Sequence, residues 1–161
     1  MQISIEQGLM AISSAMNRVQ NLYREIEQEA SFPYGLSTVL YVLFFNDATT
    51  QKQISEACAI PKQTVNNVIR ELKAQGYVTL AEDDADKRQK QVSLTATGRA
   101  YAEQTLAPLF QLNEKVGARV GAELLEKLAD GLSALGNAIE CEIELHKVAL
   151  KWEEKSGGEK E

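Results

Sequence analysis

The chain has 161 residues, of which 44% are hydrophobic and 25% charged, as is usual for a globular protein with one main core. No apolar run approaches the roughly 18 residues that a membrane-spanning helix needs, and the first 30 residues lack the pattern of an export signal. Two cysteines without framework spacing, Cys58 and Cys141, predict a reduced, cytoplasmic protein. The formal net charge of −6 argues at first against a nucleic-acid partner.

Residues 3–29 are predicted to form one long helix. Its apolar residues recur in steps of four and three, which gives a heptad-like seam: Ile5, Leu9, Ile12, Met16, Val19, Tyr23 and Ile26. Such a seam needs another helix to cover it, either within the chain or across a dimer. Residues 31–35 contain Pro33 and Gly35 and should end this helix. A strongly apolar second helix then spans residues 36–46, with Ser37 as its predicted N-cap.

Residues 50–76 have the pattern of a helix-turn-helix. Thr50 and Gln53 have the spacing of a capping box, which predicts a short helix that ends near residues 58–60. Pro61 suits the first turn of a second helix, because proline has no N–H to lose there. This second helix should end at Gly76, and it carries a buried stripe at helical spacing: Val65, Val68, Ile69 and Leu72. A short helix, a tight turn and a polar second helix are the layout of a DNA-reading motif.

Two short strands are predicted directly after the second helix. Residues 77–80 are strand formers, residues 91–94 alternate polar and apolar, and the charged segment 81–90 joins them. A β-hairpin in this position is a wing. The fold class is therefore mainly α with a small β-wing, a winged helix-turn-helix flanked by long terminal helices.

Two further helices are expected after the wing. Thr95 should cap the first, which contains Pro108 and should be kinked there. Gly117 and Gly121 mark the break to the second, which spans residues 122–152 with another apolar stripe: Leu125, Leu128, Leu132, Leu135, Ile139, Ile143, His146 and Leu150. Residues 153–161 contain Lys, Glu, Gly and Ser with nothing to bury, so they are predicted to be a flexible tail.

The negative charge is not evenly distributed along the chain. Residues 49–99 hold eight basic and six acidic residues, a net charge of +2, so the acidic excess of −8 lies in the flanking regions. Electrostatic attraction to DNA depends on where charge lies rather than on its total. The overall charge is therefore no objection to a DNA-binding lobe.

The same residues resemble a known family. Asp86-x-Arg88 followed by Val92-x-Leu94-Thr95-x-x-Gly98 is similar to the wing signature of MarR-type (multiple-antibiotic-resistance regulator) transcription factors. The pair Thr64-Val65 and the spacing Leu72-x-x-x-Gly76-Tyr77-Val78 match the recognition helix of that family. The chain departs from the commoner pattern at Ala59, at Pro61 and in the acidic approach to Lys87-Arg88. The resemblance covers about a third of the chain.

The polar face of the second motif helix supplies the candidate DNA contacts in the major groove: Lys62, Gln63, Thr64, Asn66, Asn67 and Arg70. Amide side chains suit adenine, whereas lysine and arginine can reach guanine or phosphate. In the wing, Arg88 is the candidate for minor-groove insertion, and Lys87 and Lys90 are candidate phosphate contacts. The resemblance implies that Asp86 orients Arg88 through an ion pair. The alternative for both sets is a solvated charged surface.

The resemblance also implies an effector and a dimer. The effector would be a small aromatic anion, bound between the dimerisation helices and the winged lobe. The candidate residues are aromatic: Tyr23, Phe32, Tyr34, Tyr41 and Phe45. The alternative is that these residues are simply part of the hydrophobic core. We expect residues 1–30 and 100–152 to form a helical dimerisation region, and residues 31–99 to form the DNA-binding lobe. The predicted interface of the homodimer contains Ile5, Leu9, Ile12, Leu132, Leu135, Ile139, Ile143 and His146.

An enzymatic function is not predicted, and no metal or cofactor is expected. The chain has one histidine and lacks a nucleophile elbow, a phosphate loop and a paired-cysteine metal motif. Cys58 and Cys141 are interpreted as small hydrophobic residues rather than redox sensors. The predicted function is a sequence-specific regulator, by analogy a repressor, that binds a palindromic DNA operator as a homodimer. The alternative is a winged helix that serves only as a protein-interaction module.

Overall fold

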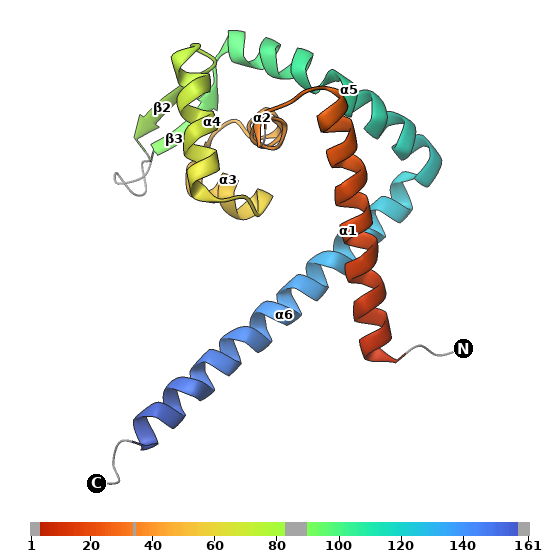
Figure 1. The fold of residues 1–161 in the computed structure, drawn as a ribbon, viewed down its shortest axis with the longest axis vertical. Coiled ribbons are helices and arrows are strands. Elements are labelled where there is room, and N and C mark those ends of the chain that lie inside the picture. Colours follow the sequence, from red (N-terminus) through yellow and green to blue (C-terminus); the bar gives the residue numbers. More distant parts are fainter. Residues whose placement is uncertain (1–3, 34, 83–89, 158–161) are drawn as a thin grey trace. The chain divides into compact units, whose positions relative to one another are not determined.

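The computed structural model describes residues 4–33, 35–82 and 90–157, with side chains up to residue 147. Apart from strand β1, the elements follow the predicted order (Figure 1): α1 (Ile5–Glu29), α2 (Leu36–Phe45), β1 (Thr49–Thr50), α3 (Gln51–Cys58), α4 (Lys62–Ala74), β2 (Val78–Glu82), β3 (Lys90–Leu94), α5 (Ala96–Val120) and α6 (Ala122–Gly157). The chain divides into two compact units, Met1–Leu112 and Asn113–Glu161. The predicted fold class, mainly α with a small β-wing, is confirmed.

Helix α1 is stabilised at its start by a capping box. The Ser4 hydroxyl accepts a hydrogen bond from the Gln7 amide N–H at 3.2 Å, and the Gln7 side chain accepts from the Ser4 N–H at 3.0 Å. Within the described chain no residue of α1 is buried, although the helix is strongly amphipathic. Within its own unit, Met1–Leu112, its apolar face is therefore largely uncovered, although Ile26 packs against the core.

Helix α2 begins one residue earlier than its predicted cap. Gly35 is the N-cap with a φ of 80°, a left-handed conformation that favours glycine. Ser37 is not the cap: it is 1% exposed, and its hydroxyl donates a hydrogen bond to the Glu27 carboxylate of α1. The prediction failed because a serine near a helix start has the same local pattern whether it caps its own helix or binds a neighbouring one.

The sheet has three antiparallel strands in the order β1-β3-β2. The wing strands pair in register from Val78 opposite Leu94 to Glu82 opposite Lys90. Strand β1 pairs Thr49 with Val92 and was not predicted, because two residues are too short to show an alternating pattern. This pairing joins the start of the helix-turn-helix to the wing.

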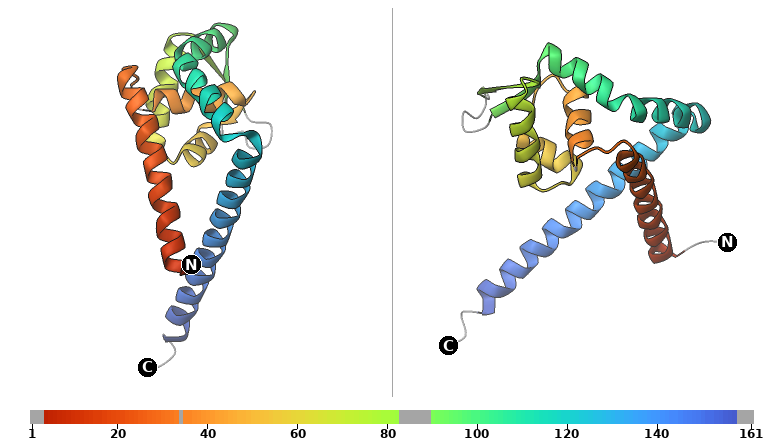
Figure 2. Two further views of the ribbon diagram at one scale, coloured as in Figure 1. Left: turned by 90° about the vertical axis from the view of Figure 1, so that its right-hand side faces the viewer. Right: turned by 45° about the horizontal axis from the view of Figure 1, so that its top comes forward.

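The core lies within the first unit, between α2, the helix-turn-helix, the sheet and the first half of α5. Helix α4 contacts both α2 and β2, as the views in Figure 2 also show. The predicted stripe of α4 is buried. It belongs to one core cluster with these residues of other elements: Val39, Leu40, Leu43, Ile54, Val78, Val92, Ala102, Leu106 and Leu109. This core holds α4 in place and leaves its opposite face outside.

The first turn of α5 lies against Gly76 and Tyr77, which connect α4 to β2. The Thr95 N–H donates to the Tyr77 carbonyl at 2.9 Å, and the Thr95 hydroxyl donates to the Gly76 carbonyl at 2.8 Å. Gly98 approaches so closely that a Cβ there would lie 1.8 Å from the Tyr77 carbonyl oxygen. The rings of Tyr77 and Tyr101 stack beside this contact at 4.2 Å between centroids.

The C-terminal helices differ from the prediction at their boundaries. Helix α5 contains Pro108, as predicted, but it continues through Gly117, and the break falls at Gly121 alone, with a φ of 83°. Helix α6 extends to Gly157, beyond its predicted end at residue 152, because the Glu and Lys of residues 153–155 are good helix formers. None of the helices in the described ranges combines the length and apolar character needed to cross a membrane.

Candidate nucleic-acid interface

Local hydrogen bonds fix the start of α3 and the turn between α3 and α4. The Thr50 hydroxyl accepts from the Gln53 N–H at 3.2 Å and the Gln53 side chain accepts from the Thr50 N–H at 2.8 Å, which confirms the predicted capping box. The Ser55 hydroxyl donates to the Ile60 carbonyl at 2.8 Å and so closes the turn. Ala59 adopts the left-handed conformation (φ 50°) in which glycine is commoner, and Pro61 is the N-cap rather than the first helical residue.

The outer face of α4 carries the predicted major-groove residues. Four of the six are exposed, namely Lys62, Gln63, Asn66 and Arg70. Asn67 is half-buried, as is Thr64, whose methyl group faces Gly35: a Cβ there would lie 2.9 Å from it. Val65 and Val68 between them are buried. The helix thus presents one polar, donor-rich face away from the core.

Three of these side chains are joined in a chain of hydrogen bonds. The Asn67 Oδ1 accepts from the Gln63 Nε2 at 3.1 Å and from the Arg70 Nη2 at 3.2 Å. The spacing of four and three residues places all three on one side of the helix. The sequence indicated the three residues but not this connection.

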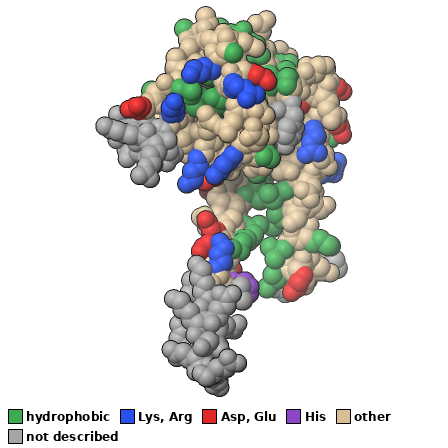
Figure 3. All heavy atoms as spheres, turned by 60° about the vertical axis from the view of Figure 1, so that its left-hand side comes forward, with side chains coloured by type: hydrophobic (Ala, Val, Ile, Leu, Met, Phe, Trp, Pro, Cys, Tyr) green, Lys and Arg blue, Asp and Glu red, His purple; other side chains and the backbone are tan. Residues whose placement is uncertain are grey.

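Basic side chains gather on the face of the lobe that carries α3 and α4 (Figure 3). The exposed lysines and arginine there include Lys52, Lys62, Arg70 and Lys73. Lys52 forms an i,i+4 ion pair with Glu56 at 3.8 Å, with both side chains 60% exposed, so this pair contributes little to stability. This face supplies positive charge where a DNA backbone would attract it.

The wing is described only in its strands. Lys90 lies opposite Glu82 at the outer end of the β2–β3 ladder and is exposed. Asp86, Lys87 and Arg88 lie outside the described residues, so their roles remain predictions. Strands β2 and β3 follow α4 in the order that a winged helix-turn-helix requires.

The predicted effector residues that the structure describes come from three segments of the first unit. Tyr41 and Phe45 lie together with ring centroids 4.9 Å apart, and they are 38% and 61% exposed. Phe32 is half-buried and packs against the core instead. Tyr23 is 37% exposed on α1, and Tyr34 lies outside the described residues.

Two further aromatic residues and one arginine lie near the pair formed by Tyr41 and Phe45. Phe110 of α5 lies 6.1 Å from both Tyr41 and Phe45, and Phe44 lies 5.2 Å from Phe110, measured between ring centroids. The Arg99 guanidinium lies over the Phe44 ring at 5.1 Å from its centroid. The sequence contained no local signal for this arrangement, because Arg99 and Phe110 come from a different helix.

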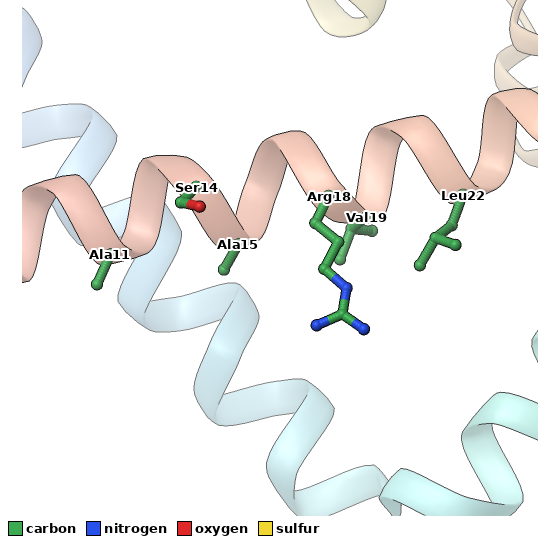
Figure 4. Close-up of a pocket in the computed structure, with 6 residues that line it drawn as sticks. All are labelled: Ala11, Ser14, Ala15, Arg18, Val19 and Leu22. Carbon is green, nitrogen blue, oxygen red and sulfur yellow. The ribbon is translucent and has the colours of Figure 1, made fainter.

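Helix α1 carries an open hollow along one face, lined by Ala11, Ser14, Ala15, Arg18, Val19 and Leu22. Figure 4 shows Ala15, Arg18, Val19 and Leu22 projecting from the same side of the helix. Alanines beside larger apolar residues let another helix approach closely. The hollow suits a helix more than a small polar ligand.

The two cysteines and the histidine lie in different environments. Burial raises the pKa of the Cys58 thiol, whose sulfur lies 3.9 Å from the Thr38 carbonyl oxygen, so a reactive thiolate is disfavoured. Cys141 and His146 are exposed on α6. The described side chains contain no group of three or more His, Cys, Asp or Glu residues that could hold a metal ion.

The fold and the exposed face of α4 define a winged helix-turn-helix protein of the DNA-binding class. The MarR family model matches residues 37–89. An uncharacterized HTH-type transcriptional regulator of Bacillus subtilis, YwaE, is 31% identical, and the match covers 78% of this chain and 81% of that one. The chain belongs to the MarR family of DNA-binding transcriptional regulators.

Solved structures give the same result. NMB1585, a MarR family regulator from Neisseria meningitidis, is 32% identical with a TM-score of 0.73, over 86% of this chain and 98% of that chain. NadR in complex with 4-hydroxyphenylacetate shares the fold at 20% identity and a TM-score of 0.64, over 83% of this chain and 93% of that chain. The predicted family and the predicted fold are therefore confirmed.

Proposed function

We propose that the protein is a homodimeric repressor that binds a palindromic operator and is released by a small aromatic anion. The observation that carries the dimer is the uncovered apolar face of α1. Five residues of its seam are between 37% and 53% exposed in the single chain: Leu9, Ile12, Met16, Val19 and Tyr23. A monomer rarely leaves a continuous apolar stripe of this length in water.

Helix α6 carries a second uncovered stripe. Leu125, Leu128, Leu132, Ile139 and Ile143 are between 41% and 50% exposed. Two long helices with heptad-like seams are best covered by the same helices of a second copy, in a two-fold arrangement. We assign the interface to these seams, including Ile5, Leu135 and His146 as predicted from the sequence.

The proposed DNA contacts are divided between two grooves. In the major groove, α4 would present its polar face: Lys62, Gln63, Thr64, Asn66, Asn67 and Arg70. In the wing, Arg88 would enter the minor groove, Asp86 would orient it, and Lys87 and Lys90 would contact phosphates. Two copies related by a two-fold axis would read half-sites about 10 base pairs apart.

The proposed effector site is the exposed aromatic group of α2 and α5. Tyr41 and Phe45 offer ring faces, and Arg99 offers a positive charge beside Phe44. An aromatic carboxylate has the matching features, a flat ring and a negative charge. That NadR binds 4-hydroxyphenylacetate in a similar fold supports this class of ligand. Tyr23, Phe32 and Tyr34 are the other predicted candidates.

The test is repeated selection from an unbiased pool of double-stranded DNA. We expect a two-fold-symmetric site to be enriched, with binding that weakens steeply as salt rises, because phosphate contacts release counterions. Arg70→Gln should change the preferred base pairs. The matched control, Lys73→Gln, removes the same charge from the same helix and should lower affinity without changing the site. Enrichment of no symmetric sequence would contradict the proposal and favour a protein-interaction module.

The effector is tested on the selected operator. A panel of aromatic carboxylates, with 4-hydroxyphenylacetate among them, is titrated into the protein–DNA complex. At least one should lower operator occupancy, and Phe45→Ala should weaken that response while leaving affinity for DNA alone unchanged. A response that is equally strong in Phe45→Ala would exclude this aromatic group as the site.

A further inference from the structure

The amide orientations in the Gln63–Asn67–Arg70 chain are fixed by chemistry. An arginine has five N–H donors and no acceptor, so the Asn67 atom 3.2 Å from the Arg70 Nη2 has to be the oxygen. The Gln63 atom 3.1 Å from that same oxygen then has to be the amide nitrogen. The order of donors and acceptors along this face is therefore the one that satisfies both hydrogen bonds.

This order leaves different groups free on the three side chains. Asn67 has used its one oxygen twice and keeps only N–H donors. Gln63 keeps its oxygen and one N–H, which are the acceptor and donor that contact the N6 and N7 edge of adenine. Arg70 keeps its other guanidinium N–H groups, which can form the two-point contact with the O6 and N7 of guanine. Two of the three side chains thus retain a complete base-reading pair.

Burial supports the same division of roles. Asn67 is half-buried, whereas Gln63 and Arg70 on either side of it are exposed. Asn67 also has a shorter side chain than glutamine or arginine, so its amide stays closer to the helix than the ends of its two partners can reach. Without the hydrogen bonds to Asn67, which we call the hub, the long side chains of Gln63 and Arg70 would sample many rotamers. Ordering them on DNA would then cost conformational entropy. A hub that holds both ends lowers that cost before DNA binds.

We propose that Asn67 is a positioning residue, that Gln63 reads an adenine and that Arg70 reads a guanine in the same half-site. This inference rests on the proposed function, because it assumes that α4 enters the major groove. Gln63 and Arg70 lie two helical turns apart, about 10 Å along the helix at 1.5 Å per residue. At about 3.4 Å per base pair, the adenine and the guanine are about three base-pair steps apart.

The experiment compares DNA selections for the full chain and five variants. With the wild type, each half-site should contain an A·T pair and a G·C pair about three steps apart. Gln63→Ala should lose the preference for adenine only, and Arg70→Ala the preference for guanine only. Asn67→Ala should lose both, each falling from about tenfold or more to nearly none.

A conservative variant separates positioning from a general loss of structure. Asn67→Asp keeps an acceptor oxygen at the hub, so both base preferences should survive even though the added negative charge lowers overall affinity. Gln75→Ala is the matched control, since it removes an exposed amide at the end of the same helix that is not among the proposed DNA contacts. It should leave both preferences intact. Circular dichroism verifies that each variant is folded.

Two results would overturn the inference while leaving the proposed function in place. One is a palindromic wild-type site without the paired adenine and guanine at this spacing. The other is an Asn67→Ala variant that relaxes a single, third base pair, because Asn67 would then read a base itself. If the wild type enriches no palindrome at all, the proposed function itself fails.

Discussion

Gly98→Ala tests the close contact between Gly98, at the start of α5, and Tyr77, just after α4. A Cβ on Gly98 would lie 1.8 Å from the Tyr77 carbonyl oxygen and 2.7 Å from its carbonyl carbon. These atoms are backbone, so they cannot rotate away as a flexible side chain could. The helix turn or the chain at Tyr77 has to shift to make room.

The cost follows from what that shift disturbs. Overpacking of a close contact costs about 1–3 kcal/mol. The hydrogen bonds from the Thr95 N–H to Tyr77 and from its hydroxyl to Gly76 contribute about 0.5–1.5 kcal/mol each. Alanine recovers about 1 kcal/mol through its better helix propensity. The expected net loss in free energy of unfolding is therefore about 1–5 kcal/mol.

The assay is urea unfolding followed by circular dichroism at one fixed protein concentration, because the proposed association between two copies would contribute to stability. The matched control is Gly117→Ala in the same helix, where a Cβ meets no atom of the described chain within 4 Å. This variant should be as stable as the wild type or more stable by up to about 1 kcal/mol. If Gly98→Ala unfolds within about 0.5 kcal/mol of the wild type, the reasoning about this contact is wrong.

Three further predictions concern the lobe. Thr50→Ala removes the capping hydroxyl of α3 and should lower stability by about 0.5–2 kcal/mol in the same urea assay; no loss would show that the cap is energetically irrelevant. Leu40→Ala empties a fully buried site and should cost about 2–5 kcal/mol, whereas a cost below 1 kcal/mol would contradict the assigned core. The third prediction uses a Cys141→Ser background, so that Cys58 is the only thiol. The raised pKa of Cys58 leaves less thiolate at pH 8 than an ordinary thiol has, so iodoacetamide should react more slowly with the native chain than with the urea-unfolded chain. Equal rates would refute this prediction.

The helix-turn-helix was predictable because its signals are local. The capping box at Thr50, the stripe from Val65 to Leu72 and the stop at Gly76 each follow from neighbours in sequence, and the structure confirms all three. The wing strands were predictable for the same reason. These elements decided both the fold class and the family.

The features that sequence reasoning missed depend on contacts between distant residues. Ser37 binds Glu27 of another helix, and Thr49 pairs with Val92 across the sheet. Arg99 lies over Phe44, and nothing near either residue in the chain indicates it. The amide chain on α4 is an intermediate case: its spacing was visible, but the shared Asn67 oxygen depends on rotamers that no pattern of residue types specifies.

The central claim is that two copies, paired through the seams of α1 and α6, read one operator together. The most direct measurement is the mass of the complex between the full chain and a duplex that carries the selected palindrome, determined by sedimentation or native mass spectrometry. We predict two chains per duplex and two chains in the protein alone. The dimer should be lost when Leu132 and Ile139 are both changed to Asp. A saturated complex that holds a single chain would contradict the account.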